Sequence, residues 1–392
     1  MICYAAPVWA GCLSRVHIDR KLRGAQRKAL LRICRAYSTS STAALQIISG
    51  KLPIDLAILL ASKRWHLRKG HSISLSSQSF SVYETFCHPK DLLPPFMRPH
   101  IHTHPLDNDH FSIFTDGSKT ADKVGSAFVA YRKGVEFYNA SGHLAANCSV
   151  YQAELTAILL AIDWCNENYS DNRINIFTDC QSTIEAINNH LPRNPIVVKI
   201  QTSIALSTNV FAIAWIRGHT GLQGNERADY LAREAASLNS GSSLYSYIPV
   251  TYIKYLLKNE AMNTWQTRWN NTETGRITKS FIPSVSHNNR TILHRDTSLV
   301  TQFLTGHGKF NSYLVRFNKS NCDHCQLCGV PDGVEHYVFH CPMLEDARVP
   351  IRMLLPTDKS WPCQHSDLLM NNELFMAFLK LIKNYFWRTP VN

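Results

Sequence analysis

Two aspartates follow matching apolar segments of the chain. Ile113-Phe114-Thr115-Asp116 recurs as Ile176-Phe177-Thr178-Asp179, and each run reads as a strand whose end delivers an acid. Sites in open α/β sheets form where strands end, so neighbouring strands would place Asp116 and Asp179 side by side. Like charges this close require a cation between them or a proton on one of them.

A third carboxylate belongs to an expected long helix at 150–168. Glu154, Ile158, Ala161 and Cys165 follow one another at intervals of four, three and four residues, which places Glu154 on the apolar stripe. A carboxylate on a buried face needs a partner. Glu154 is therefore a candidate to share the site of the two aspartates.

The fourth acid, Asp229, lies in the first turns of a helix that Asn225 is expected to cap, after the loop His219–Gly224. Four acids without a basic partner in their motifs predict oxygen ligation of Mg²⁺ or Mn²⁺. Two such ions about 3.5–4 Å apart hydrolyse phosphodiesters. His219 would assist proton transfer or product release.

A second constellation is rich in sulfur. Cys325-x2-Cys328-x7-His336-x4-Cys341 has the spacing and donor types of a tetrahedral Zn²⁺ site. Cys322, His324 and His340 are spare candidates for the ligand set, and a cluster of reduced cysteines in a compact turn is the plainer alternative. Sites of this kind bind single strands or act as structural clips.

The elements that must position the acids form an α/β pattern. We expect a mixed sheet with flanking helices, built from strands at 111–115, 125–131, 135–141, 173–178 and 210–216 and helices at 150–168, 182–190, 197–207 and 225–236. A Ser-, His- and Pro-rich stretch at 71–110 and a Ser-rich stretch at 237–246 read as linkers.

Residues 111–240 resemble a type 1 ribonuclease H domain. The matching stretches are FTDGS, YQAELTAI, FTDCQS and GHTGLQGNERADYLA. The resemblance implies a ribonuclease H-like five-stranded mixed sheet and cleavage of the RNA strand of RNA–DNA hybrids with Mg²⁺. It also implies the catalytic residues, which would be Asp116, Glu154, Asp179, Asp229 and His219.

The chain lacks the acidic motifs of two classes of enzyme with related folds. An integrase needs a Glu about 35 residues after its second Asp, where this chain has Ala214-Trp215. A proofreading exonuclease needs Asp-x-Glu on the first strand, where this chain has Asp116-Gly117-Ser118.

Charge is uneven along the 392 residues, whose net charge is +12. Residues 1–110 hold 15 Lys and Arg against 6 Asp and Glu, residues 111–240 hold 10 against 12, and residues 241–392 hold 16 against 11. The basic flanks favour a nucleic-acid partner. The expected helix around 15–35 is basic on all but one apolar stripe, which favours a helix along a nucleic-acid backbone over a merely solvated face.

The two ends of the chain carry a further resemblance, to parts of larger polyproteins. Segments at 4–9 and 24–56, and the tail from about Val300, resemble polyproteins of non-LTR retrotransposons of the R1-like and I-like groups. We expect a helical remnant of the reverse transcriptase at 1–70, a linker at 71–110, the ribonuclease domain at 111–240, and a mixed C-terminal region at 248–392 with the zinc site at 325–341. No Tyr-x-Asp-Asp polymerase motif is present.

Composition excludes membrane-spanning and secreted classes of protein. No apolar run reaches the roughly 18 residues of a membrane span, and the N-terminus lacks the basic start of a signal peptide. We expect a protein of nucleus or cytoplasm, not secreted, with reduced cysteines, and the sequence leaves its oligomeric state open. The alternative to an enzyme is a non-catalytic nucleic-acid-binding remnant. Because none of the four acids departs from type, the enzyme is favoured.

Overall fold

The chain forms two compact units, one of which is discontinuous in sequence. Unit 1 comprises Met1–Lys63 with Leu257–Asn392, and unit 2 comprises Arg64–Leu256. The computed structural model describes residues 2–106, 111–121, 123–237, 243–285 and 297–388. The division into four sequence segments stays a prediction, and 107–110 and 238–242 of the expected linkers lie outside the described residues.

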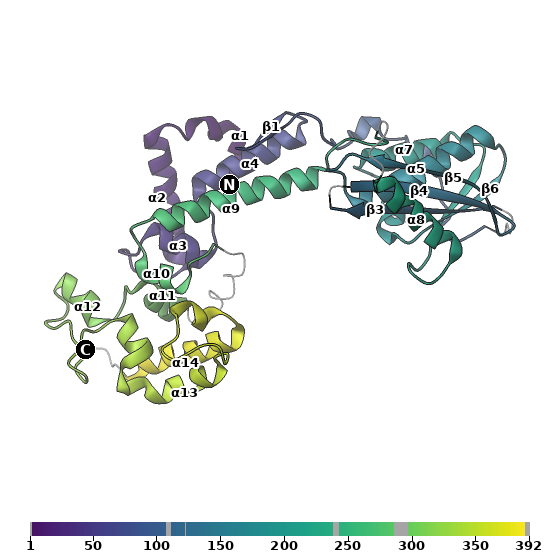
Figure 1. The fold of residues 1–392 in the computed structure, drawn as a ribbon. Helices are drawn as coiled ribbons and strands as arrows, with labels where there is room; N and C mark the ends of the chain where they lie inside the picture. The colour runs from purple at the N-terminus through teal and green to yellow at the C-terminus, as the bar shows by residue number, and fades with distance from the viewer. Residues whose placement is uncertain (1, 107–110, 122, 238–242, 286–296, 389–392) are drawn as a thin grey trace. The chain divides into compact units, whose positions relative to one another are not determined.

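A five-stranded mixed sheet forms the centre of unit 2 (Figure 1), which confirms the predicted fold class. Its strands are β3 (Ser112–Thr120), β4 (Lys123–Arg132), β5 (Val135–Leu144), β6 (Arg173–Thr178) and β7 (Val210–Trp215). Their order is β5-β4-β3-β6-β7. The first three strands along the chain pair antiparallel, and β3, β6 and β7 pair parallel.

The sequence repeat is aligned in the sheet. Ile113 pairs with Ile176 and Thr115 with Thr178 across the parallel strands β3 and β6. One expectation was wrong: β3 does not end at Asp116 but continues to Thr120, and Asp116 pairs with Ala127 of β4. The hairpin partner β4 extends the strand, so it is the parallel pairing with β6 that stops just before the acid.

Helices cover both faces of this sheet. They are α5 (Val150–Asn168), α6 (Gln181–Ile187), α7 (Pro195–Ala205) and α8 (Gln223–Ser237). Ile113 and Phe128 face a large apolar core with α5, α6 and α7, while Val129 and Phe114 face a smaller cluster under α8. Because side chains alternate along a strand, one sheet carries two separate cores.

The start of α8 differs from the expectation. Asn225 is not the cap, because the helix begins at Gln223 and includes Asn225, whose side chain is buried. Gly224 explains the close packing at this end, since a Cβ there would lie 2.2 Å from the Phe114 ring. A short hairpin of β1 (Ile73–Ser74) and β2 (Ser79–Phe80) and two 3-10 turns lie within the expected first linker.

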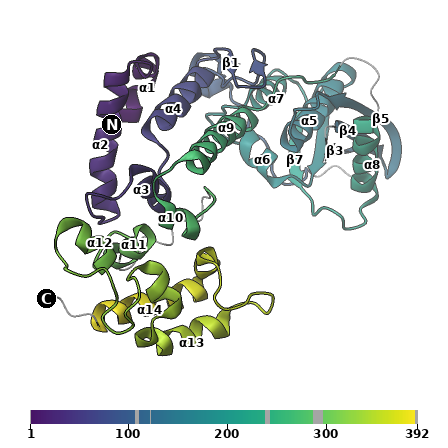
Figure 2. The ribbon, with the colours of Figure 1, turned by 60° about the vertical axis from the view of Figure 1, so that its left-hand side comes forward.

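Unit 1 is helical (Figure 2), including the C-terminal region that was expected to be mixed. Its helices are α1 (Ala6–Trp9), α2 (Val16–Ile33), α3 (Thr42–Ser49), α4 (Ile54–Arg68), α9 (Val250–Asn271), α10 (Arg276–Phe281), α11 (Thr297–Thr305), α12 (Asn311–Leu314), α13 (Glu345–Leu354) and α14 (Asn372–Arg388), with α4 and α9 crossing the boundary between the units.

One core joins the two sequence segments of unit 1. Leu30 and Leu45 from the N-terminal segment belong to the same buried cluster as Phe303, Tyr337 and Phe378 from the C-terminal segment. Within the described residues no single helix is long and apolar enough to cross a membrane, and the bent pair α3–α4 meets that criterion by length and composition only.

Candidate active site and metal centre

Three of the predicted carboxylates converge beside strands β3 and β6. Asp116 comes from β3, Glu154 from the first turns of α5, and Asp179 from the residue that follows β6. One oxygen of each lies within 4.8 Å of the others. Asp116 and Glu154 are buried and Asp179 is half-buried, so the cluster opens to solvent on the Asp179 side.

Two glycines allow this convergence. A Cβ at Gly117 would lie 2.4 Å from the backbone nitrogen of Glu154, so a side chain there would push α5 away from β3. A Cβ at Gly218 would lie 2.6 Å from Oδ2 of Asp179. The glycine of FTDGS therefore lets β3 and α5 bring Asp116 and Glu154 together, and the glycine of GHTG lets its loop pass close to Asp179.

Burial and mutual repulsion disfavour the charged forms of these carboxylates when no cation lies between them. Burial, reinforced by the neighbouring Asp179 carboxylate, raises the pKa of Asp116 to about 6. Burial and the charge of Asp116 raise the pKa of Glu154 well above its usual range. Oε2 of Glu154 is buried and finds no hydrogen-bond partner among the described residues. Close, poorly solvated oxygens of this kind fit a hard divalent cation.

Asp229 stands apart from the three. Its carboxylate accepts a hydrogen bond from Nε of Arg233 at 2.8 Å, one turn further along α8, and forms an ion pair with that guanidinium. Sequence reasoning grouped Asp229 with the other acids and gave it no basic partner. The structure supplies the partner through helical spacing, and a metal-ligating role for Asp229 stays a prediction.

His219 lies on the exposed loop before α8. Its backbone has φ of 55°, in the left-handed region that residues other than glycine seldom adopt. Against burial and the Asp179 charge, positive charge on Arg233 and His219 acts to lower the pKa of Asp116. The structure gives no hydrogen bond or ion pair between the His219 ring and an acid among the residues that it describes, and the role of His219 stays a prediction.

Sequence reasoning missed a hub that holds the start of α5. The Glu84 carboxylate accepts hydrogen bonds from Gln152 at 3.0 Å, Tyr245 at 3.0 Å and Asn194 at 3.3 Å. Gln152 also closes a capping box with Ser149, a Ser-x-x-Gln signal that the sequence does contain. Glu84, in the expected linker, carries no such signal.

The predicted sulfur cluster also assembles. Ligand atoms of Cys325, Cys328, His336 and Cys341 all lie within 4.8 Å of one another, and the sulfurs of Cys328 and Cys341 are 3.8 Å apart. Nε2 of His336 is buried without a hydrogen-bond partner among the described residues. Three thiols and one unpartnered imidazole fit a tetrahedral Zn²⁺ site.

The spare candidates are placed elsewhere. Cys322 and His324 are exposed and form a separate group with Asp323, whose carboxylate lies 2.6 Å from the His324 ring. His340 is exposed and faces Glu335 at 3.9 Å. Geometry thus favours the four residues of the main spacing.

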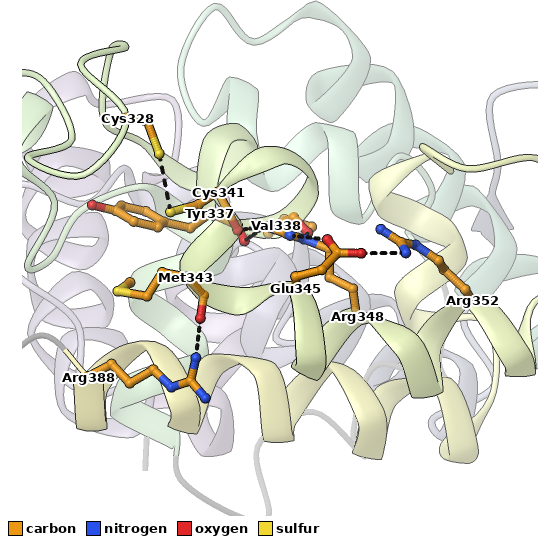
Figure 3. A network of polar contacts seen from close by, with 9 residues as sticks. All are labelled: Cys328, Tyr337, Val338, Cys341, Met343, Glu345, Arg348, Arg352 and Arg388. Carbon is orange, nitrogen blue, oxygen red and sulfur yellow. Dashed lines mark hydrogen bonds and ion pairs between the residues drawn. The ribbon is translucent and has the colours of Figure 1, made fainter.

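A buried arginine contacts the backbone of the segment that carries two of these ligands (Figure 3). The Arg348 side chain is fully buried and donates to the carbonyl oxygens of Val338 at 2.9 Å, Tyr337 at 3.2 Å and Cys341 at 2.6 Å. It also forms an ion pair with Glu345 at 3.0 Å. These carbonyls belong to the π-helical turn 336–340 and the residue after it, so Arg348 fixes the segment that carries His336 and Cys341.

Comparison with known proteins points to one family. Residues 108–237 match the family model described as RNase H. A protein named Ribonuclease H from Campylobacter jejuni is 32% identical over 138 residues, which cover 32% of this chain and 91% of that protein.

Other relatives are retrotransposon proteins. The "Retrovirus-related Pol polyprotein from type-1 retrotransposable element R1" of Bradysia coprophila is 38% identical over 96 residues, covering 24% of this chain and 10% of the relative. A protein of the same kind from Nasonia vitripennis, R1 4, is 33% identical over 89 residues, covering 22% of this chain and 23% of the relative. The chain thus spans only a tenth to a quarter of the length of these relatives.

Proposed function

The chain belongs to the ribonuclease H family, and on that premise we propose that it hydrolyses the RNA strand of RNA–DNA hybrids. The observation that carries the proposal is the cluster of Asp116, Glu154 and Asp179 oxygens within 4.8 Å of one another. Relatives named Ribonuclease H and R1 Pol polyproteins support it. The basic composition of the chain supports a nucleic-acid partner.

The three clustered acids would hold divalent metal, Mg²⁺ or Mn²⁺, and Asp229 would join them once it is released from Arg233. When bound, two such ions supply an activated water and stabilise the departing oxygen at the scissile phosphate. Glu154 and Asp116, held by α5 and β3, fix the geometry from the buried side. Asp179 faces solvent, where the substrate strand would approach.

His219 would handle protons in this scheme. Its exposed imidazole lies on the loop that passes Asp179 at Gly218. From that position it can give a proton to the departing 3′ oxygen or take one during product release. Selectivity for hybrids would come from the shape of the duplex and the 2′-hydroxyls of the RNA strand, with little preference for sequence.

The test is cleavage of a hybrid labelled on its RNA strand by the purified chain with Mg²⁺. We expect cutting by the wild type, and its loss both in EDTA and in Asp179→Asn. Glu167→Gln is the matched control, because this exposed acid lies at the far end of α5 and should cut normally. Intact binding of the hybrid without cutting would instead support a non-catalytic nucleic-acid-binding remnant.

We propose further that Cys325, Cys328, His336 and Cys341 bind Zn²⁺ as a structural clip. Elemental analysis of the purified chain should find about one zinc per chain, by the stoichiometry of such sites. Cys341→Ser should lose the zinc, whereas Cys322→Ser, the exposed spare, should keep it. Equal loss from both variants would contradict this ligand set.

A further inference from the structure

Helix α2 presents two opposite faces. Leu30 is buried in the core of unit 1, and Leu22 and Gln26 are half-buried on the same side. On the other side Lys21, Lys28 and Arg32 are exposed. Their spacing of seven and four residues keeps these three cations on one face of the helix.

Two other arginines of α2, Arg23 and Arg27, are engaged within the chain. Arg23 pairs with Asp19 at 2.7 Å, and Arg27 donates to the Ser40 carbonyl and the Thr42 hydroxyl at 2.8 Å. The structure gives no hydrogen bond or ion pair to the side chains of Lys21, Lys28 or Arg32 from any residue that it describes. The charge of these three residues is thus available to an outside partner.

Gly24 lies between the cations, and neither the packing nor the backbone conformation requires a glycine at this position. A Cβ at this position would meet nothing within 4 Å, and its backbone is ordinary helix. Glycine weakens a helix interior relative to alanine. Its neighbour Ala25 is also small and exposed. Together they leave the helix backbone open to close approach between Lys21 and Lys28.

We propose that the Lys21, Gly24, Lys28 and Arg32 face of α2 binds the sugar-phosphate backbone of nucleic acid. From Lys21 to Arg32 the face runs about 16 Å along the helix. Each strand of a duplex carries a phosphate every 3.4 Å of its axis, so the face spans roughly five phosphates. Lysine and arginine are the side chains that most often contact phosphate oxygens, so we assign this face to the backbone of the strand.

This second site lies in unit 1 and does not depend on hydrolysis by unit 2. Its test therefore uses the full chain with Asp179→Asn, so that the hybrid stays whole and a failure of the proposed activity leaves the result readable. The measurement is fluorescence anisotropy of a labelled RNA–DNA hybrid, titrated at several salt concentrations. The test variant carries Lys21→Gln, Lys28→Gln and Arg32→Gln together.

We expect the triple variant to raise Kd about tenfold and to lower the slope of log K against log salt by about two to three, at roughly 0.9 for each phosphate that is no longer neutralised. The control variant carries Arg276→Gln, Lys319→Gln and Lys380→Gln, three exposed cations of the same unit that share no face with one another. It removes the same net charge and should leave the slope within about one of the parent. Equal slopes in the two variants would overturn the proposal.

Two further results separate a direct contact from diffuse attraction. Gly24→Leu changes no charge, and we expect it to weaken binding severalfold while the circular dichroism of the helices is kept. Unchanged binding by Gly24→Leu would contradict close approach at this face. If the triple variant binds the hybrid normally but no longer binds vesicles of anionic lipid, a membrane surface replaces nucleic acid as the partner.

Discussion

At the scale of single residues, the buried acids make stability depend on pH. The folded-state pKa of Asp116, about 6, is above its ordinary value of 3.8. The folded state then binds more protons, so this contribution is fully present below the ordinary pKa and is lost as pH rises through 6. Two pKa units correspond to about 3 kcal/mol of unfolding free energy.

The check is thermal unfolding of the metal-free chain between pH 4 and pH 7, about the range of that titration. Wild type should lose stability across this range, and Asp116→Asn should flatten the loss because the amide does not titrate. Asp171→Asn, at an exposed turn, should keep the wild-type slope. A wild-type slope in Asp116→Asn would show that this carboxyl does not carry the effect.

Arg348 is the residue on which we expect the cysteine cluster to depend most. Arg348→Met keeps much of the apolar stem of the side chain but removes the guanidinium that donates to three carbonyls, which should cost about 3 kcal/mol of unfolding free energy. Zinc retention against a competing chelator should fall with it. Arg352→Met is the matched control, since Arg352 pairs with the same Glu345 from an exposed position. Equal effects from the two substitutions would place Arg348 outside the support of the cluster.

At the scale of elements, the same substitution should have opposite signs at two glycines. A Cβ at Gly125 would lie 2.1 Å from the Ala232 carbonyl oxygen, so Gly125→Ala must displace α8 from β4 and should destabilise by about 2 kcal/mol. Gly24→Ala adds a methyl group in open space and should stabilise by about 0.5–1 kcal/mol. Chemical denaturation measures both. Destabilisation by both changes would rule out open space at Gly24.

The bounds of the helices and strands show how much of the fold could be predicted from the sequence. Strand β6 and helix α5 were predicted to the residue, because apolar periodicity and a capping residue are local signals. The length of β3 was not, because the strand past Asp116 is held by its hairpin partner β4. The Glu84 hub joins residues up to 161 positions apart, and no local pattern records such contacts.

The convergence of three of the acids was predictable from the sequence, and the pairing of the fourth, Asp229, was not. Motif spacing named Asp116, Glu154 and Asp179, and the structure brings them together. The ion pair of Asp229 with Arg233 was overlooked, although its spacing of four residues is a helical signal. Motif comparison treats the four acids alike, whereas local charge gives one of them a partner.

At the scale of the whole molecule, each unit has its own core. The core of unit 1 contains Cys34 and Leu45 of the N-terminal segment together with Cys325, Cys341 and Tyr337 of the cysteine cluster, so one buried network extends from the cluster to the helices on which α2 packs. The core of unit 2 is built by its sheet with α5, α6 and α7. Contacts distant in sequence define unit 1, and apolar periodicity along the chain therefore could not reveal it.

This arrangement predicts that removal of zinc affects binding and cleavage differently. Metal binding at such a cluster is coupled to folding, so a zinc-selective chelator in excess Mg²⁺ should lower the melting temperature of unit 1 and weaken hybrid binding through α2. The carboxylate cluster has its own core, so kcat at saturating hybrid should change little. Differential scanning calorimetry and cleavage assays on the same samples measure both effects. A fall in kcat that follows the melting of unit 1 would show that the two units do not function independently.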